Sequence, residues 1–208
     1  MENAENYLVD RENKIIKLFD PPFEAWDINV GYIKRYLPGI RENGGQYTHA
    51  AVWFAIAEAI LGFGEKAVEF LKMINPITHT LGKEDCKKYK LEPYILPADI
   101  YSAGGLEGRG GWNWYTGASG WYIKAVIEFV IGFRIKEGYI LIEPSVPKTW
   151  KEFGINYKYK TSNYIIKIKN PNEKNTGVTS FILDGEQVTE KRAKLQNDGK
   201  IHTIEIYM

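Results

Sequence analysis

Cysteine and histidine are scarce in this sequence, and their scarcity excludes several kinds of site. Of 208 residues, one is cysteine and three are histidine. Cys86 has no second cysteine with which to form a disulfide, so a disulfide framework is excluded and a reducing compartment is expected. No metal-ligand spacing links His49, His79 and His202, and the sequence predicts neither a metal site nor a cofactor.

The sequence also lacks an excess of either charge and any long apolar run. It has 27 basic and 26 acidic residues, so the positive potential expected of a nucleic-acid-binding protein is missing. The apolar run at residues 50–57 is far shorter than the roughly 20 residues of a membrane-spanning helix. The polar, acidic residues 1–6 are the opposite of a signal peptide. We therefore expect a soluble, cytoplasmic protein without nucleic-acid or membrane partners.

Helical patterns prevail in the first part of the chain. The residues at about 48–61 form an apolar helix whose one charged residue is Glu58. An amphipathic helix is expected at 65–73 and a third helix at 117–131, whereas 75–90 is expected to be a loop. Three helices do not close a helical core by themselves, so their cover is missing or comes from a second copy of the chain.

From Gly132 onward, short apolar or alternating segments replace the helical period. Turn-forming residues separate these segments, and Asp184-Gly185 is the best hairpin turn among them. The pattern predicts an antiparallel β module. Its strands are expected at 133–135, 139–142, 155–160, 164–169, 178–183 and 202–207.

A polar loop at residues 41–49 runs directly into the first helix and is a candidate binding site. Most of its side chains can form hydrogen bonds, and Gly44-Gly45 allows a sharp turn or a close approach of the backbone to a ligand. The loop is suited to a hydrophilic ligand such as a sugar or an anion. It is equally suited to capping the helix, with Thr48 as the N-cap residue.

A glycine-rich and aromatic stretch at residues 104–120 is the second candidate. Thr116 can cap the third helix, and the exposed amides of Gly117 and Ala118 then form an anion site, to which Arg109 and His49 add charge. The alternative is a cap without a ligand. Four carboxylates lie near these two stretches, but nothing in the sequence selects a catalytic pair: Glu42, Glu92, Asp99 and Glu107.

Four motifs of this sequence carry information when they are taken together. They are Gly31-Tyr32-Ile33-Lys34, residues 38–50 (Pro-Gly-Ile-Arg-Glu-Asn-Gly-Gly-Gln-Tyr-Thr-His-Ala), Glu92-Pro93-Tyr94 and residues 108–117 (Gly-Arg-Gly-Gly-Trp-Asn-Trp-Tyr-Thr-Gly). In this order they resemble the C-terminal part of glycoside hydrolase family 94, the inverting glycoside phosphorylases. The resemblance covers about residues 18–150 and is strongest to the branch with cyclic β-1,2-glucan synthases and β-1,2-oligoglucan phosphorylases.

The resemblance implies an α + β chain: residues 1–131 as the last helices of an (α/α)6 barrel and residues 132–208 as a small antiparallel β-sandwich domain. It also implies a reaction. In the family, inorganic phosphate attacks the anomeric carbon while an aspartic acid protonates the leaving glycosidic oxygen. The family's pattern implies that His49, Thr116 and Gly117 bind the phosphate, which is a co-substrate rather than a cofactor.

The same resemblance implies that Tyr36, Arg41 and Glu42 contact the acceptor-side sugar. Two departures from the family pattern matter. The Asp-Trp-Asn-Asp type motif that carries the general acid is absent from this sequence. A glutamine that cellobiose phosphorylases place after the Glu-Pro-Tyr motif is here Ala98 followed by Asp99, which argues against cellobiose as substrate.

The preferred hypothesis is a C-terminal piece of a β-glucan phosphorylase or synthase-type enzyme that binds oligosaccharide and phosphate but is inactive alone. Whether this chain is an enzyme by itself therefore stays open. One alternative is a free-standing carbohydrate-binding or interaction module, and another is one half of a split enzyme completed by a separately encoded chain. We also expect the isolated chain to form homo-oligomers through its uncovered helices.

Overall fold

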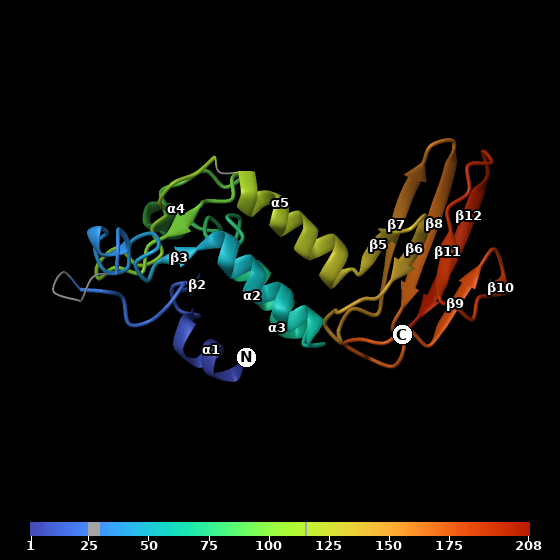
Figure 1. The fold of residues 1–208 in the computed structure, drawn as a ribbon, viewed down its shortest axis with the longest axis horizontal. Coiled ribbons are helices and arrows are strands. Elements are labelled where there is room, and N and C mark those ends of the chain that lie inside the picture. The colour runs from blue at the N-terminus through green and yellow to red at the C-terminus, as the bar shows by residue number, and fades with distance from the viewer. Residues whose placement is uncertain (25–29, 115) are drawn as a thin grey trace. The chain divides into compact units, whose positions relative to one another are not determined.

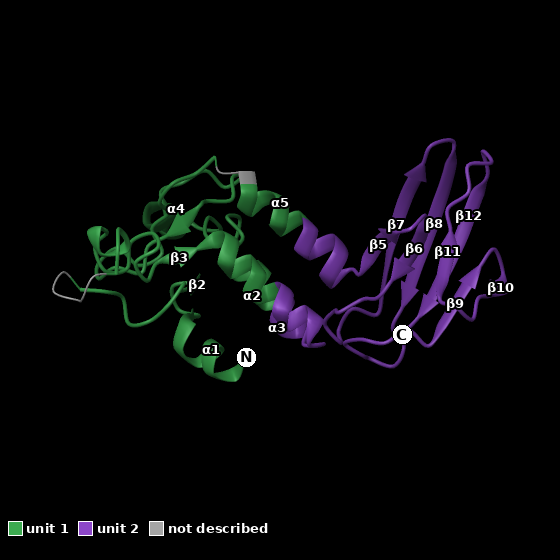
Figure 2. Ribbon diagram, viewed as in Figure 1, with its two compact units in different colours: residues 1–55, 69–123 green, residues 56–68, 124–208 purple. Residues whose placement is uncertain are grey.

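A computed structural model describes residues 1–24, 30–114 and 116–208, without the side chain of Thr116. The chain forms two compact units (Figure 2). Unit 1 contains residues 1–55 and 69–123, and unit 2 contains residues 56–68 and 124–208. The predicted domains, 1–131 and 132–208, remain a prediction.

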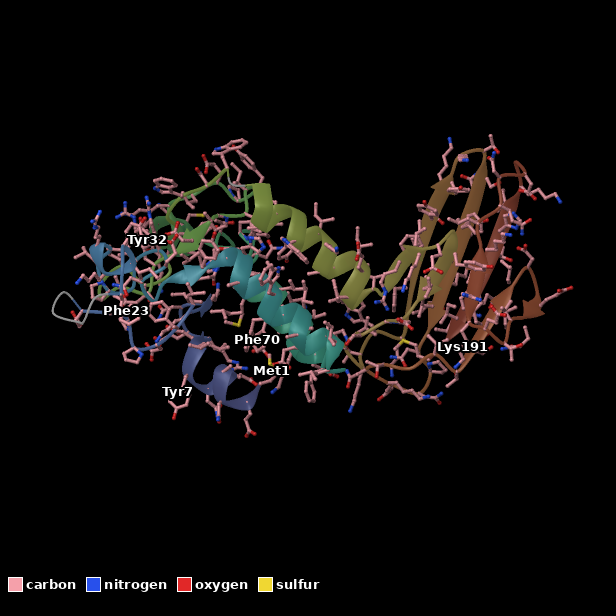
Figure 3. The ribbon with its side chains drawn as sticks, in the orientation of Figure 1. Met1, Tyr7, Phe23, Tyr32, Phe70 and Lys191 are labelled. Carbon is pink, nitrogen blue, oxygen red and sulfur yellow. The ribbon has the colours of Figure 1, made fainter. Side chains whose placement is uncertain are left out.

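Unit 1 combines helices with very short strands (Figure 1). Two antiparallel ladders hold it together, one between β1 and β2 and one between β3 and β4. Its elements are α1 (Glu2–Leu8), β1 (Val9–Asp10), β2 (Ile15–Ile16), a 3-10 turn (Ile33–Arg35), β3 (Gln46–Tyr47), the start of α2 (Thr48–Ile60), the end of α3 (Gly64–Met73), α4 (Lys83–Tyr89), β4 (Asp99–Ile100) and most of α5 (Thr116–Lys124). Tyr7 projects outward from α1 (Figure 3), and 70% of it is exposed.

The helices predicted at 48–61 and 65–73 are confirmed, as α2 and α3. Phe70, predicted to face inward from the second helix, is fully buried, and its ring lies 5.2 Å from that of Phe54 on α2. The burial of side chains on α2 does not follow their polarity. Its single charged residue, Glu58, is fully buried, whereas 52% of Trp53 and 68% of Ile60 is exposed.

The prediction of a loop at 75–90 is wrong, because Lys83–Tyr89 forms helix α4. The charge order explains the helix. Glu84 and Asp85 lie in its first turn and Lys87 and Lys88 in its last, which matches the direction of the helix dipole. Lys90 ends the helix in the left-handed conformation, at φ 59°. The run of charges that looked like a solvated loop is therefore a helix-forming pattern.

The third predicted helix is present but changes its geometry. It is α-helical as far as Lys124 and continues as a π-helix over Ala125–Val130, with the amide of Ile131 donating to the carbonyl of Val126. It stops at Gly132, whose φ is 78°. A Cβ there would lie 2.1 Å from the carbonyl oxygen of Glu143, so only glycine fits.

Unit 2 contains all the longer strands, arranged in two sheets. The five-stranded sheet has the order β10-β9-β12-β8-β7, and the three-stranded sheet has the order β11-β6-β5. Buried residues line both sheets, and the rings of Phe133 on β5 and Tyr157 on β7 lie 5.1 Å apart. The strands are β5 (Phe133–Lys136), β6 (Tyr139–Ile142), β7 (Glu152–Tyr159), β8 (Ser162–Lys169), β9 (Ser180–Leu183), β10 (Glu186–Gln187), β11 (Arg192–Lys194) and β12 (Ile201–Tyr207).

The predicted hairpin at Asp184-Gly185 is confirmed: both residues have positive φ, and Leu183 pairs with Glu186 across them. The expectation of purely antiparallel pairing holds for most of the module but is wrong for β12. That strand pairs antiparallel with β9 and parallel with β8. The short strands β10 and β11 were not predicted, because two or three residues carry too little alternation to be recognised.

Candidate functional site

The polar loop is held in place by buried side chains that bind backbone groups. Gln46 accepts a hydrogen bond from the amide of Ile16 and donates one to the hydroxyl of Thr48, the first residue of α2. Asn43, fully buried, bonds to both backbone groups of Phe23 and donates to the carbonyl of Tyr36. These bonds orient the side chains that the loop presents.

Tyr36, Arg41 and Glu42, the three residues expected to contact sugar, line one pocket of about 180 Å³ in unit 1. The antiparallel ladder between β3 and β4 brings in the opposite wall, since Tyr47 pairs with Asp99. Trp112 belongs to the second candidate stretch, so the pocket unites both candidate stretches. Its complete lining is Tyr36, Arg41, Glu42, Tyr47, Ala98, Asp99 and Trp112.

Arg41 is the cation of this pocket, and aromatic rings flank it. Its guanidinium carbon lies 3.7 Å from the ring centroid of Trp112 and 5.3 Å from that of Tyr36. Its backbone has φ 49°, in the left-handed region that few non-glycine residues adopt. The cation and the rings together offer polar edges and apolar faces, the two features with which proteins hold sugars.

Asp99 is a buried carboxyl group in the wall of the pocket, with only 3% of the residue exposed. Its Oδ1 accepts a hydrogen bond of 2.8 Å from the amide of Trp112. Its Oδ2 is buried and has no hydrogen-bond partner among the described residues. Burial raises the pKa of this carboxyl group, while the Trp112 amide and the charge of Arg41 act against that rise.

Gly111 makes room for that carboxyl group. A Cβ at Gly111 would lie 2.3 Å from Oδ2 of Asp99, closer than any side chain tolerates. The Gly111 amide also donates to the Asp99 carbonyl, and the Ala98 amide donates to the carbonyl of Trp112. The glycine-rich stretch therefore packs its backbone directly against β4.

His49 lies beside the start of α5, as the phosphate hypothesis requires. A Cβ on Gly117 would be 3.6 Å from Nδ1 of His49. Its Nε2 is buried, and it has no hydrogen-bond partner in the part of the chain that the structure describes. The third predicted phosphate ligand, the Thr116 side chain, lies outside the described residues. Tyr47 lines the pocket of Arg41, and its ring stacks parallel to that of His49 at 6.4 Å.

Two tryptophans complete the surroundings of His49. Its ring lies 4.8 Å from that of Trp53 and 5.9 Å from that of Trp121, and the two tryptophans are 5.4 Å apart. Spacing in the sequence did not indicate this cluster, because Trp121 reaches it from another helix. Asp99 and Trp112 were similarly hidden: sequence reasoning noted one as a nearby carboxylate and the other only inside a motif.

Other candidates lie elsewhere in unit 1. Arg109, expected to add charge at the phosphate site, lines a separate pocket of about 260 Å³ with Glu107 and lysines of the α4 region. Glu92 accepts a hydrogen bond of 2.5 Å from Asn113. Of the four carboxylates considered as catalytic candidates, only Glu42 and Asp99 therefore line the pocket of Arg41.

A larger cleft of about 770 Å³ lies in unit 2 but contains none of the predicted site residues. Two ion pairs lie in its lining, Arg134 with Glu143 and Arg192 with Glu190, and the lining also includes Glu128 and Lys191.

The part of the chain that the structure describes lacks two further kinds of feature. No group of three or more histidine, cysteine or acidic side chains there is arranged to hold a metal ion. No helix there is long and apolar enough to cross a bilayer.

Known proteins resemble most of this chain. Cyclic beta-(1,2)-glucan synthase NdvB of Rhizobium meliloti is 42% identical over 173 residues, which are 83% of this chain and 6% of the synthase. N,N'-diacetylchitobiose phosphorylase of Vibrio furnissii is 30% identical over 81% of this chain and 21% of its own length. The 1,2-beta-oligoglucan phosphorylase of Listeria innocua is 25% identical over 77% of this chain and 16% of its own length. The chain thus spans about a fifth or less of these relatives.

The match to the family itself extends over more than half of the chain. Residues 1–132 match the catalytic domain of the glycosyl hydrolase 94 superfamily. That stretch contains every residue that lines the pocket of Arg41, as well as His49 and Gly117. The family resemblance read from the motifs is confirmed: this chain belongs to the glycosyl hydrolase 94 superfamily.

Proposed function

We propose that this chain supplies the acceptor-sugar and phosphate-binding parts of a family 94 active site that cleaves or transfers β-glucosides with inversion. The observation that carries the proposal is the single pocket that unites Tyr36, Arg41 and Glu42. Helices α2, α3 and α5 would then be the last helices of an (α/α)6 barrel, and the two sheets a C-terminal β-sandwich. The names of the synthase and phosphorylase relatives support β-glucans as the substrate class.

In this pocket a pyranose ring would lie against the aromatic rings while its hydroxyls bond to the charged edge. Trp112 and Tyr36 offer apolar faces, and Arg41 offers N–H donors between them. Glu42 offers an acceptor for sugar hydroxyls. The donors of Arg41 and the acceptor oxygens of Glu42, next to aromatic faces, would orient the sugar in this pocket.

Phosphate would bind at the start of α5, next to His49. Backbone N–H groups at a helix N-terminus attract anions, and Gly117 leaves the approach to them open. The buried, unpartnered Nε2 of His49 is available as an additional donor when it carries a proton. In the reaction, a phosphate oxygen bonds to the anomeric carbon as the glycosidic bond breaks. The leaving oxygen then takes a proton from a general acid.

This sequence has no Asp-Trp-Asn-Asp type motif to provide that acid. General-acid catalysis contributes roughly a hundredfold to ten-thousandfold to such reactions. We therefore propose that the chain binds its ligands but does not turn them over alone.

The test is a phosphorolysis assay of the whole chain with β-1,2-glucooligosaccharides and inorganic phosphate. No release of sugar 1-phosphate is expected. Clear release would overturn the proposed division of the site. Binding is measured in parallel by NMR, with phosphate and a β-glucoside titrated separately. Arg41→Ala is expected to weaken only sugar binding, and His49→Ala only phosphate binding. If neither variant weakens binding of its ligand, the assignment of the pocket is wrong.

A further inference from the structure

The charges of the sugar pocket are unbalanced. One guanidinium, that of Arg41, faces two carboxyl groups, those of Glu42 and Asp99. The rings of Trp112 and Tyr36 both flank the Arg41 guanidinium, whose carbon lies 3.7 Å from the centroid of the Trp112 ring. Among the described residues, Arg41 is the only arginine, lysine or histidine that lines this pocket.

Asp99 is the more deeply buried of the two carboxyl groups. It is 97% buried (3% exposed), and only one of its oxygens has a hydrogen-bond donor among the described residues. A buried acceptor without a donor costs free energy, so a ligand or water that brings a donor toward it is favoured. A ligand that brings another negative charge to the pocket is repelled, since the low dielectric of a buried site screens charges weakly.

We propose that Asp99 makes this pocket selective for uncharged, hydroxyl-bearing sugars over sugars that carry a carboxylate. The inference rests on the proposed function of the pocket and adds the residue that sets its charge preference. Asp99 is held rigidly for this role. β4 fixes its backbone, the Trp112 amide holds Oδ1, and the absent Cβ of Gly111 leaves the space that Oδ2 fills.

Two probes that differ only at C6 test the proposal: methyl β-glucoside carries a hydroxymethyl group there and methyl β-glucuronide a carboxylate. Their dissociation constants for the whole chain are measured by NMR titration, read at the indole N–H of Trp112. The wild-type chain is expected to bind the glucoside more tightly. Asp99→Asn keeps the size of the side chain and a carbonyl oxygen for the Trp112 amide but removes the charge. It is expected to reduce the preference for the neutral sugar by roughly tenfold.

Asp85→Asn is the matched control, because it removes a negative charge from unit 1 outside the pocket. It should leave the preference unchanged. Glu42→Gln provides a second test that does not alter the buried position: it should also shift the preference toward the glucuronide.

The outcomes separate the two claims. If the wild-type chain binds both sugars equally, or if Asp99→Asn leaves the ratio unchanged, the role of Asp99 is overturned while the sugar pocket stands. If neither sugar at tens of millimolar shifts the Trp112 resonance in the wild-type chain, the proposed function of the pocket fails, and the selectivity claim fails with it.

Discussion

At the scale of the residue, a missing side chain shapes the pocket as much as any side chain that is present. Gly111 is the clearest case, because the Asp99 carboxyl group occupies the space where its Cβ would be. Gly44 and Gly45, noted in the sequence as a place for close approach, are likewise packed against neighbouring backbone and proline atoms. The sequence showed that these glycines were there, but only the fold shows what each one accommodates.

Gly111→Ala is predicted to destabilise the chain by about 1–3 kcal/mol, because the added methyl group displaces the buried carboxyl group. The measurement is the free energy of unfolding from urea denaturation. Gly104→Ala serves as control, since nothing lies within 4 Å of a Cβ at that position. A Gly111 variant as stable as the Gly104 variant would show that the packing of Gly111 against Asp99 is not tight.

At the scale of the element, a histidine ties β12 to two turns. His202 is buried, with Nδ1 2.7 Å from a carboxylate oxygen of Asp184 and Nε2 3.2 Å from one of Asp198. Asp184 belongs to the turn between β9 and β10, and Asp198 precedes β12. The bond to Asp184 contributes most to raising the pKa of His202, and Asp198 raises it further against the effect of burial.

The contacts of His202 with Asp184 and Asp198 predict a pH dependence of stability. The folded state binds the proton of His202 more tightly than the unfolded state, whose pKa is near 6.5. The stabilisation is therefore complete below about pH 6.5 and is lost as the pH rises through the higher folded pKa. Unfolding free energies of the wild type and His202→Asn, measured between pH 5.5 and pH 9, should converge as the pH rises. A difference in unfolding free energy that widens with pH would contradict the stabilising role of His202.

The elements differ in how well the sequence predicts them, for physical reasons. Helices α2 and α3 follow from apolar periodicity, and the Asp184-Gly185 turn follows from the need for positive φ at both positions. Helix α4 was missed because Tyr89 is its one buried residue, so the segment shows no apolar periodicity. The parallel pairing of β12 with β8 could not be predicted, because residue alternation indicates a strand but not its partner.

At the scale of the whole molecule, the exposed apolar side chains of α2 predict self-association. Trp53 and Ile60 are more than half exposed, and the chain spans only a small part of its relatives' length. Isolated chains are expected to associate as concentration rises, which sedimentation or light scattering can follow. Ile60→Lys should weaken the association and Lys72→Glu, on an exposed position of α3, should not. A strict monomer at high concentration contradicts the prediction.

The amino-acid sequence alone was enough to assign the family, the main helices, the β module and the polar loop. These follow from local patterns and from motifs that stay contiguous in the chain, such as residues 38–50. Only the tertiary structure decided that Asp99 and Trp112 share a pocket with Arg41, and that His49 lies beside Gly117. The reason is that strand pairing and helix packing bring together residues that are distant in sequence, and neither spacing nor composition records those contacts.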